Sequence, residues 1–145
     1  MGWQEIVIDI VRQNWSKLRP VPIPKETFRI VEDHTYPAWW HMGKQNDQPA
    51  TQISARYFVT NIALGKALIT GCKLNLVGSD EAYHLRHLVR QMKFKDEDMP
   101  TRLVSVDGFI EPPITKDGEP LEAQIFFIDQ FGNENPGPVT TFRPE

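Results

Sequence analysis

Glu81, His84 and His87 are the residues whose types and spacing come closest to a metal-binding motif. They follow one another at three-residue steps, so on a helix they would share one face. Glu-x-x-His is a known arrangement of metal ligands, although a carboxylate-bridged site needs a second such motif and the chain has none. The other interpretation is a solvated face flanked by Arg86 and Arg90. A metal-binding protein or metal-dependent enzyme is therefore the alternative function.

Aromatic and histidine residues gather in the segment 34–48, which reads HTYPAWWHMGKQNDQ and is predicted to be an irregular loop. Trp and Tyr are enriched in interface hot spots because they bury a large area at a small cost in entropy. Adjacent tryptophans on an extended chain face opposite ways, so at least one should be structural, and the other is left for an outer surface, a second layer or a partner. The partner-binding candidates are His34, Tyr36, Trp39, Trp40 and His41. A pocket beside this loop would instead make the domain a ligand-binding sandwich.

The remaining chemistry-bearing residues favour structure over catalysis. Cys72, the single cysteine, lies in an apolar run, and a buried inert thiol is the expected state of such a residue. The chain has no serine nucleophile motif, phosphate loop or dinucleotide fingerprint. We therefore predict no catalytic residue and no cofactor, and the leading function is a non-enzymatic protein-interaction or accessory module.

The composition is that of an ordinary soluble domain. The chain has 145 residues, of which 40% are hydrophobic and 24% charged, and its net charge of −3 argues against a general nucleic-acid surface. One cysteine cannot form an intrachain disulfide, which fits a reducing compartment. No apolar run is long enough for a transmembrane segment. The start, MGWQEIVIDIV, lacks the basic residues of a secretory signal, so a cytoplasmic location is expected.

Residues 1–19 are predicted to form an N-terminal amphipathic helix. The apolar residues recur at three- and four-residue steps, although the β-branched run from Ile6 to Val11 would also suit a strand. This stripe could pack within the protein or pair with another copy, and the self-association candidates are Trp3, Val7, Ile10 and Trp15. A proline-rich linker is predicted over 20–26, because each proline biases its predecessor away from helix.

Residues 27–145 are predicted to form a mainly β domain. Strands are expected at 27–32, 52–62, 67–77, 102–110, 125–128 and 139–142, with turn signals between them, and the last two are expected to form a C-terminal hairpin. Alternation in the 52–62 strand gives two faces, neither of them cleanly polar: Ile53, Ala55, Tyr57, Val59 and Asn61 on one, and Ser54, Arg56, Phe58, Thr60 and Ile62 on the other. The simplest partner of the 67–77 strand is the strand before it. A short helix is expected at about 79–93, with Ser79 as its cap, although Tyr83, Leu85 and His87 would alternate on a strand. About six to eight turn-separated strands without βα alternation predict an antiparallel β-sandwich.

Three segments, ARYFVTNI, GFIEPP and FFIDQFGNE, resemble a set of bacterial immunoglobulin-like β-sandwich domains. In that set a strand ending in Val-Thr-Asn precedes a strand ending in Pro-Pro, and an Asp-Gln-Phe-Gly-Asn-Glu turn closes the domain. The resemblance would cover about residues 27–143. It implies an immunoglobulin-like fold and carries no activity.

Overall fold

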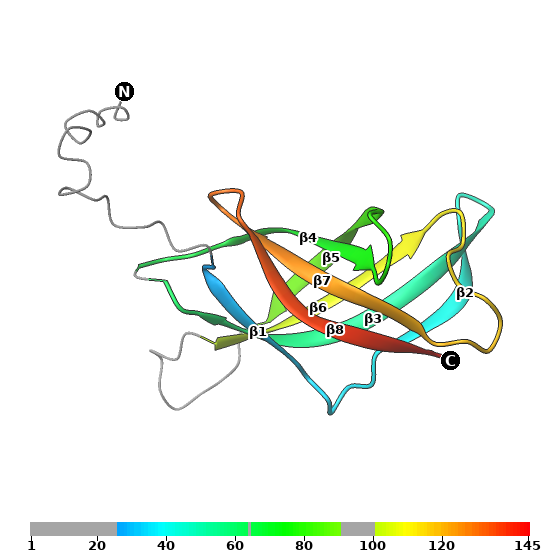
Figure 1. Ribbon diagram of the computed structural model, residues 1–145, viewed down its shortest axis with the longest axis horizontal. Helices are drawn as coiled ribbons and strands as arrows, with labels where there is room; N and C mark the ends of the chain where they lie inside the picture. The colour runs from blue at the N-terminus through cyan, green and yellow to red at the C-terminus, as the bar shows by residue number, and fades with distance from the viewer. Residues whose placement is uncertain (1–25, 64, 91–100) are drawn as a thin grey trace, which may run out of the picture.

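The computed structural model describes residues 26–63, 65–90 and 101–145, and their regular elements are strands (Figure 1). The strands in chain order are β1 (Phe28–Glu32), β2 (Trp39–Gln45), β3 (Gln48–Asn61), β4 (Ile69–Leu76), β5 (Ala82–Arg90), β6 (Thr101–Ile110), β7 (Leu121–Asp129) and β8 (Glu134–Pro144). The predicted N-terminal helix at 1–19 and the linker at 20–26, apart from Glu26, lie outside the described residues.

Seven of the strands close into a barrel, in the order β2, β3, β6, β5, β4, β7, β8 and back to β2. The closing contact is parallel and pairs Trp39 with Arg143 and Trp40 with Pro144. The prediction of an immunoglobulin-like sandwich is therefore wrong. A sandwich keeps two sheets apart, whereas here β5 pairs with β4 through its first half and with β6 through its second half, which joins the two sheets.

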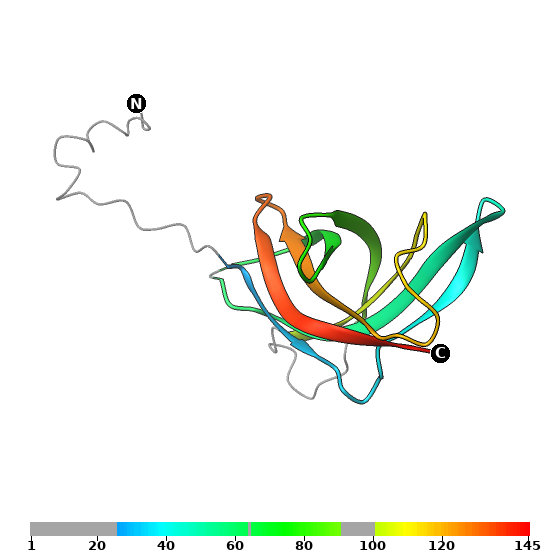
Figure 2. The same cartoon turned by 45° about the vertical axis from the view of Figure 1, so that its right-hand side comes forward.

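The long strand β3 carries two neighbours on the same side. β2 pairs with its first part, from Gln48 to Ser54, and β1 pairs with its last part, from Tyr57 to Asn61. The chain therefore leaves the barrel wall at residues 33–38. The β2–β3 hairpin extends away from the rest of the barrel (Figure 2). Asn46 and Asp47 form its turn with φ angles of 54° and 63°, as a type I′ turn requires, and Asn and Asp tolerate this conformation better than most residues do.

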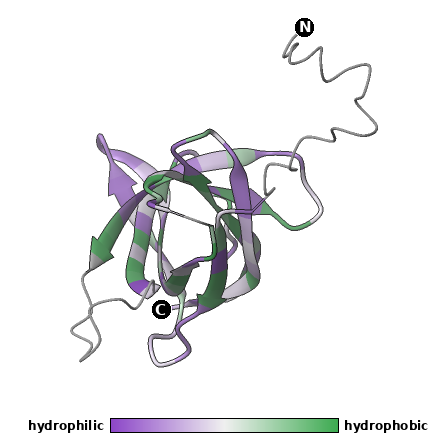
Figure 3. Ribbon diagram, turned by 90° about the vertical axis from the view of Figure 1, so that its left-hand side faces the viewer, coloured by the Kyte–Doolittle hydropathy of each residue, from purple (hydrophilic) through white to green (hydrophobic). Residues whose placement is uncertain are grey.

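Alternation along β3 separates the interior from the surface. Ile53, Ala55, Tyr57 and Val59 are buried, and the residues between them are partly exposed, which agrees with the predicted faces of this segment. Figure 3 shows the strands surrounding a common interior, with hydrophobic and hydrophilic residues alternating along them. The largest fully buried apolar side chains of the core come from β3, β4, β6, β7 and β8 and include Tyr57, Phe127, Phe142, Ile53, Leu74 and Ile125.

Three local predictions are also corrected. The expected helix at about 79–93 is replaced by strand β5, because pairing on both sides outweighs the helical spacing of its leucines. The expected loop at 34–48 contains strand β2, which β3 and β8 hold in the wall. Strand β4 pairs with β5 and β7 instead of with β3, so the 67–77 segment does not form a hairpin with its predecessor. The predicted C-terminal hairpin is confirmed as the antiparallel pair β7–β8.

Candidate interaction surface

The adjacent tryptophans of β2 take opposite sides of the barrel wall. Trp40 is only 3% exposed and its indole N–H donates to the carbonyl oxygen of Glu119 at 2.9 Å. Trp39 is half-buried on the outer face. The prediction that at least one of the two is structural is therefore confirmed, and Trp40 is the structural one.

Trp39 belongs to a fixed group of side chains on the outer face, which we call the aromatic row (Tyr36, Trp39 and His41). The indole Nε1 of Trp39 donates to the hydroxyl of Tyr36 at 3.0 Å, and that hydroxyl shares a 2.7 Å hydrogen bond with the hydroxyl of Ser54. The rings of Trp39 and His41 stack with centroids 5.0 Å apart and an angle of 4° between their planes. Each side chain of the row is therefore held by a neighbour.

Charged groups lie at both ends of the row. The guanidinium carbon of Arg56 lies 4.1 Å from the centre of the Tyr36 ring, a cation–π contact. At the other end, Nδ1 of His41 is 3.7 Å from a carboxylate oxygen of Glu145. Within the described part of the chain, Arg56 has no carboxylate partner. Its side chain therefore keeps hydrogen-bonding capacity at the surface.

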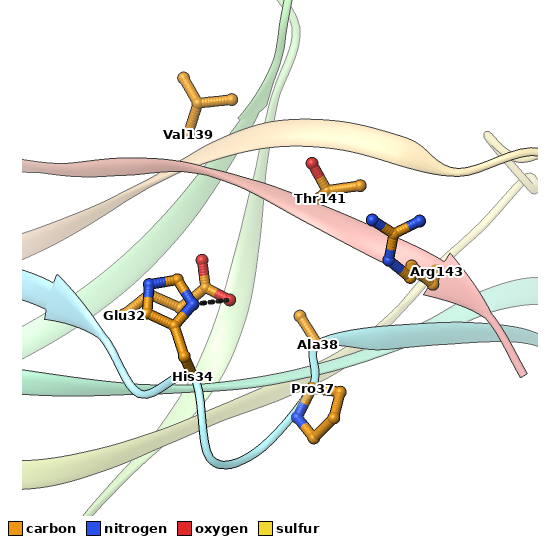
Figure 4. A pocket seen from close by; sticks show the side chains of 7 residues that line it. All are labelled: Glu32, His34, Pro37, Ala38, Val139, Thr141 and Arg143. Atoms are coloured by element: carbon orange, nitrogen blue, oxygen red, sulfur yellow. Dashed lines mark ion pairs between the residues drawn. The ribbon is translucent and has the colours of Figure 1, made fainter.

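His34 is separated from the aromatic row and belongs to a pocket of about 400 Å³ beside the 33–38 segment. Glu32 and His34 lie on one side of this pocket and Arg143 on the other, with Thr141 next to it on β8 (Figure 4). The distance between Nδ1 of His34 and the Glu32 carboxylate is 3.9 Å. The five partner-binding candidates are thus divided among the outer face, the core and this pocket.

The structure does not bring Glu81, His84 and His87 together. The helical spacing that would align them is absent, because β5 is a strand and alternate residues face opposite sides. His84 is exposed, His87 is half-buried, and Glu81 accepts a hydrogen bond from the hydroxyl of Tyr83. Among the described residues, no group of three or more His, Cys, Asp or Glu side chains is placed to hold a metal ion.

The DQFGNEN turn that follows β7 (residues 129–135) is hydrogen-bonded to the start of β1. We call the side chains of Thr27, Asp129 and Asn135 that make this connection the Asn135 network. The side-chain oxygen of Asn135 accepts hydrogen bonds from the backbone N–H groups of Thr27 and Phe28, and its amide nitrogen donates to the carbonyl oxygen of Phe127 at 3.1 Å. The Asp129 carboxylate accepts from the hydroxyl of Thr27 at 2.5 Å and from the Asn135 amide at 3.3 Å. The network ties β1 to the β7–β8 hairpin.

Two buried groups have shifted pKa values with clear causes. Burial of Asp129 opposes its ionisation, but hydrogen bonds from the Thr27 hydroxyl, from two backbone N–H groups of the turn and from the Asn135 side chain outweigh that effect and lower its pKa. Burial raises the pKa of the Cys72 thiol to about 12. Cys72 is 1% exposed, so the predicted burial of this thiol is confirmed.

Sequence reasoning missed the residues that come to the surface site from other strands. Ser54 and Arg56 were expected on one face of their strand, but that alternation does not reveal that Tyr36 and Trp39 lie against them. Arg143 gave no signal, because only barrel closure brings β8 beside β2. The self-association candidates Trp3, Val7, Ile10 and Trp15 lie outside the described residues, and their role stays a prediction.

The part of the chain that the structure describes contains no helical segment with the length and apolar character of a membrane span. Comparisons with protein-family models, with curated proteins and with solved structures found no match to this chain.

Proposed function

We propose that this protein is a non-enzymatic interaction or accessory module whose protein partner docks on the aromatic row. The observation that carries the proposal is the fixed stack of Trp39 on His41, held through the Tyr36 hydroxyl. Ordering a free side chain at an interface costs about 0.5–1.5 kcal/mol. Because the rings are already held in position, a partner that binds them would lose little side-chain entropy, and its binding would be less opposed by this cost.

The geometry of the stack favours a polypeptide over a sugar. Sugars bind aromatic side chains by lying flat on an open ring face. Here the facing sides of Trp39 and His41 cover each other, and Arg56 covers one face of Tyr36. The exposed parts of the rings and the guanidinium hydrogen atoms remain as contacts, and Trp, Tyr and Arg are enriched at protein interfaces.

The positive charge of Arg56 at the Tyr36 end of the row suggests that the partner carries a negatively charged group. Arg56 has a planar set of five N–H donors, which matches a carboxylate with two parallel hydrogen bonds. Because Arg56 has no carboxylate partner within the described residues, an Asp or Glu of the partner would complete this pairing. We therefore propose an acidic segment as the partner's contact.

Other features support the non-enzymatic part of the proposal and the cytoplasm as the compartment. Asp129 is 1% exposed and saturated by hydrogen bonds, so it has no access to a substrate. Cys72 is a free thiol, and a free thiol is the usual state of cysteine in a reducing compartment.

The experiment compares the wild-type protein with the double variant Trp39→Ala/His41→Ala and with Phe131→Ala as a matched control. Phe131 is 71% exposed at the β7–β8 turn, so its loss removes an exposed aromatic residue outside the row. Each full-length protein is immobilised, exposed to extract from its native cells, and the retained proteins are quantified. The candidate partner is then purified, and its Kd for each of the three proteins and for Arg56→Gln is measured.

A partner retained by the wild type and by Phe131→Ala, with affinity at least about tenfold weaker for the double variant, supports the proposal. A second copy of the chain counts as a partner, and sedimentation over a range of concentrations detects it. If no protein distinguishes the wild type from the double variant, or if Phe131→Ala weakens binding equally, the aromatic row is not the docking site.

A further inference from the structure

The pocket beside residues 33–38 results from the way β1 and β2 share β3. The chain steps out of the barrel wall after β1 and returns at β2. Two hydrogen bonds fix the 33–38 segment. The backbone N–H of Asp33 donates to the carbonyl oxygen of Arg56 at 2.9 Å, and the Asp33 carboxylate accepts from the backbone N–H of Thr35 at 3.0 Å. The backbone N–H of Arg143 donates to the carbonyl oxygen of Ala38 at 3.1 Å. Both walls of the pocket are therefore fixed by backbone hydrogen bonds.

A carboxylate and a guanidinium line this pocket without pairing with each other (Figure 4). The Glu32 side chain is only 15% exposed, and the basic side chain nearest to its carboxylate among the described residues is His34 at 3.9 Å, beyond hydrogen-bond distance. Within the described residues, Arg143 has neither an ion-pair partner nor a side-chain hydrogen bond. The described residues therefore leave the Glu32 carboxylate and the exposed Arg143 guanidinium available to a ligand that carries the opposite charges.

We propose that this pocket binds a small zwitterion of the α-amino-acid class. The ligand ammonium would donate hydrogen bonds to the Glu32 carboxylate. The ligand carboxylate would accept from the guanidinium of Arg143 and from the hydroxyl of Thr141. A volume of about 400 Å³ is within the usual range for small-molecule sites.

Opposite charges on the two sides of the pocket favour a ligand that carries both a positive and a negative group. A simple carboxylate would gain Arg143 but face repulsion from Glu32, and a simple amine would gain Glu32 but face repulsion from Arg143. A zwitterion satisfies both walls. This inference does not rest on the proposed docking of a partner at the aromatic row, because it uses none of the row's side chains.

The test is calorimetric titration of the full-length protein with free α-amino acids, beginning with glycine, alanine, glutamate and lysine. Acetate and methylammonium serve as ligands with one charge each. The variants are Glu32→Gln, which removes the charge with little change in shape, Arg143→Gln, which removes the charge and shortens the side chain, and the charge swap Glu32→Arg/Arg143→Glu. Thermal unfolding of each variant establishes that it is folded. Phe131→Ala is the control, because Phe131 is 71% exposed at the β7–β8 turn and does not line the pocket.

We expect at least one amino acid to bind at least about tenfold more tightly than acetate or methylammonium. Glu32→Gln and Arg143→Gln should each weaken that binding about tenfold or more, the charge swap should recover part of it, and Phe131→Ala should leave it unchanged. Three results would each overturn the proposal: no amino acid binding at about 10 mM, acetate binding as tightly as the amino acids, or folded variants that bind as the wild type does.

Discussion

The Asn135 network and the aromatic row are both built from hydrogen bonds, but they differ in what remains unsatisfied. Asn135 is fully buried, and both ends of its amide are used, by Thr27, Phe28 and Phe127 among others. In the aromatic row, the side chains are partly exposed, and the Arg56 side chain has only the Tyr36 ring as a partner within the described residues. A saturated buried network stabilises the fold, whereas an ordered but unsaturated surface can also contact another molecule.

The adjacent tryptophans give the same comparison within one strand. Trp40 combines burial with a satisfied indole N–H, and Trp39 combines partial exposure with an indole N–H that organises its neighbour. The two share a backbone and a residue type, so their difference comes from the side of the wall that each one faces. Substitutions at these paired positions therefore separate stability from recognition.

Trp40→Ala should have the largest effect on stability. Removing a buried tryptophan leaves a cavity and should lower the free energy of unfolding by about 3–5 kcal/mol. Trp39→Ala, its matched control on the outer face, should lower it by about 1 kcal/mol or less. Urea unfolding measures both. Equal losses for the two variants would contradict the assignment of Trp40 to the core and Trp39 to the surface.

Asn135→Ala should have the next largest effect. The substitution removes the acceptor of the Thr27 and Phe28 N–H groups, and an unpaired buried polar group costs about 1–3 kcal/mol. The matched control is Asn133→Ala, because Asn133 contributes to the turn through its backbone N–H and carbonyl. That control should change the free energy of unfolding by about 0.5 kcal/mol or less. A large loss for Asn133→Ala would mean that the turn conformation, instead of the Asn135 side chain, carries the stability.

Sequence reasoning succeeded where the signal is local. The alternation along 52–62 places Ile53, Ala55, Tyr57 and Val59 together on one face of a strand, and the structure buries that face. The turn between Asp129 and Asn135 predicts the β7–β8 hairpin, which is present. Alternation and turn chemistry depend on a few neighbouring residues, so one sequence is enough to detect them.

The errors all concern contacts between distant segments. Leu85 and Leu88 have helical spacing, yet β4 and β6 hold them in a strand. Barrel closure depends on the pairing of Trp39 with Arg143, more than 100 residues apart in the sequence, and no local pattern encodes such a pair. For the same reason the sequence indicated the tryptophan-rich segment but not the arginines from β3 and β8 that lie beside it.

The lowered pKa of Asp129 makes part of the stability dependent on pH. Because the folded state binds the proton less readily than the unfolded state, the stabilising contribution is fully present above the unfolded pKa, about 4. It is lost as the pH falls through the lower folded pKa. The free energy of unfolding, measured by urea titration between neutral and acid pH, should therefore fall in this window. In Asp129→Asn the same window should show a smaller fall, and an equal fall would assign the effect to other groups.

Tyr36→Phe should have the smallest effect on stability and a clear effect on the order of the aromatic row. The hydroxyl that it removes is partly exposed, so the loss in free energy of unfolding should be about 1 kcal/mol or less. Because the indole N–H of Trp39 loses its acceptor, its hydrogen exchange, measured by NMR, should become faster. Ser54→Ala is the matched control, since it removes the other partner of the hydroxyl but leaves the acceptor of Trp39 in place. If Tyr36→Phe leaves the exchange rate of the Trp39 indole unchanged, the row is not ordered by this bond, and a partner would have to fix the tryptophan itself at a cost in affinity.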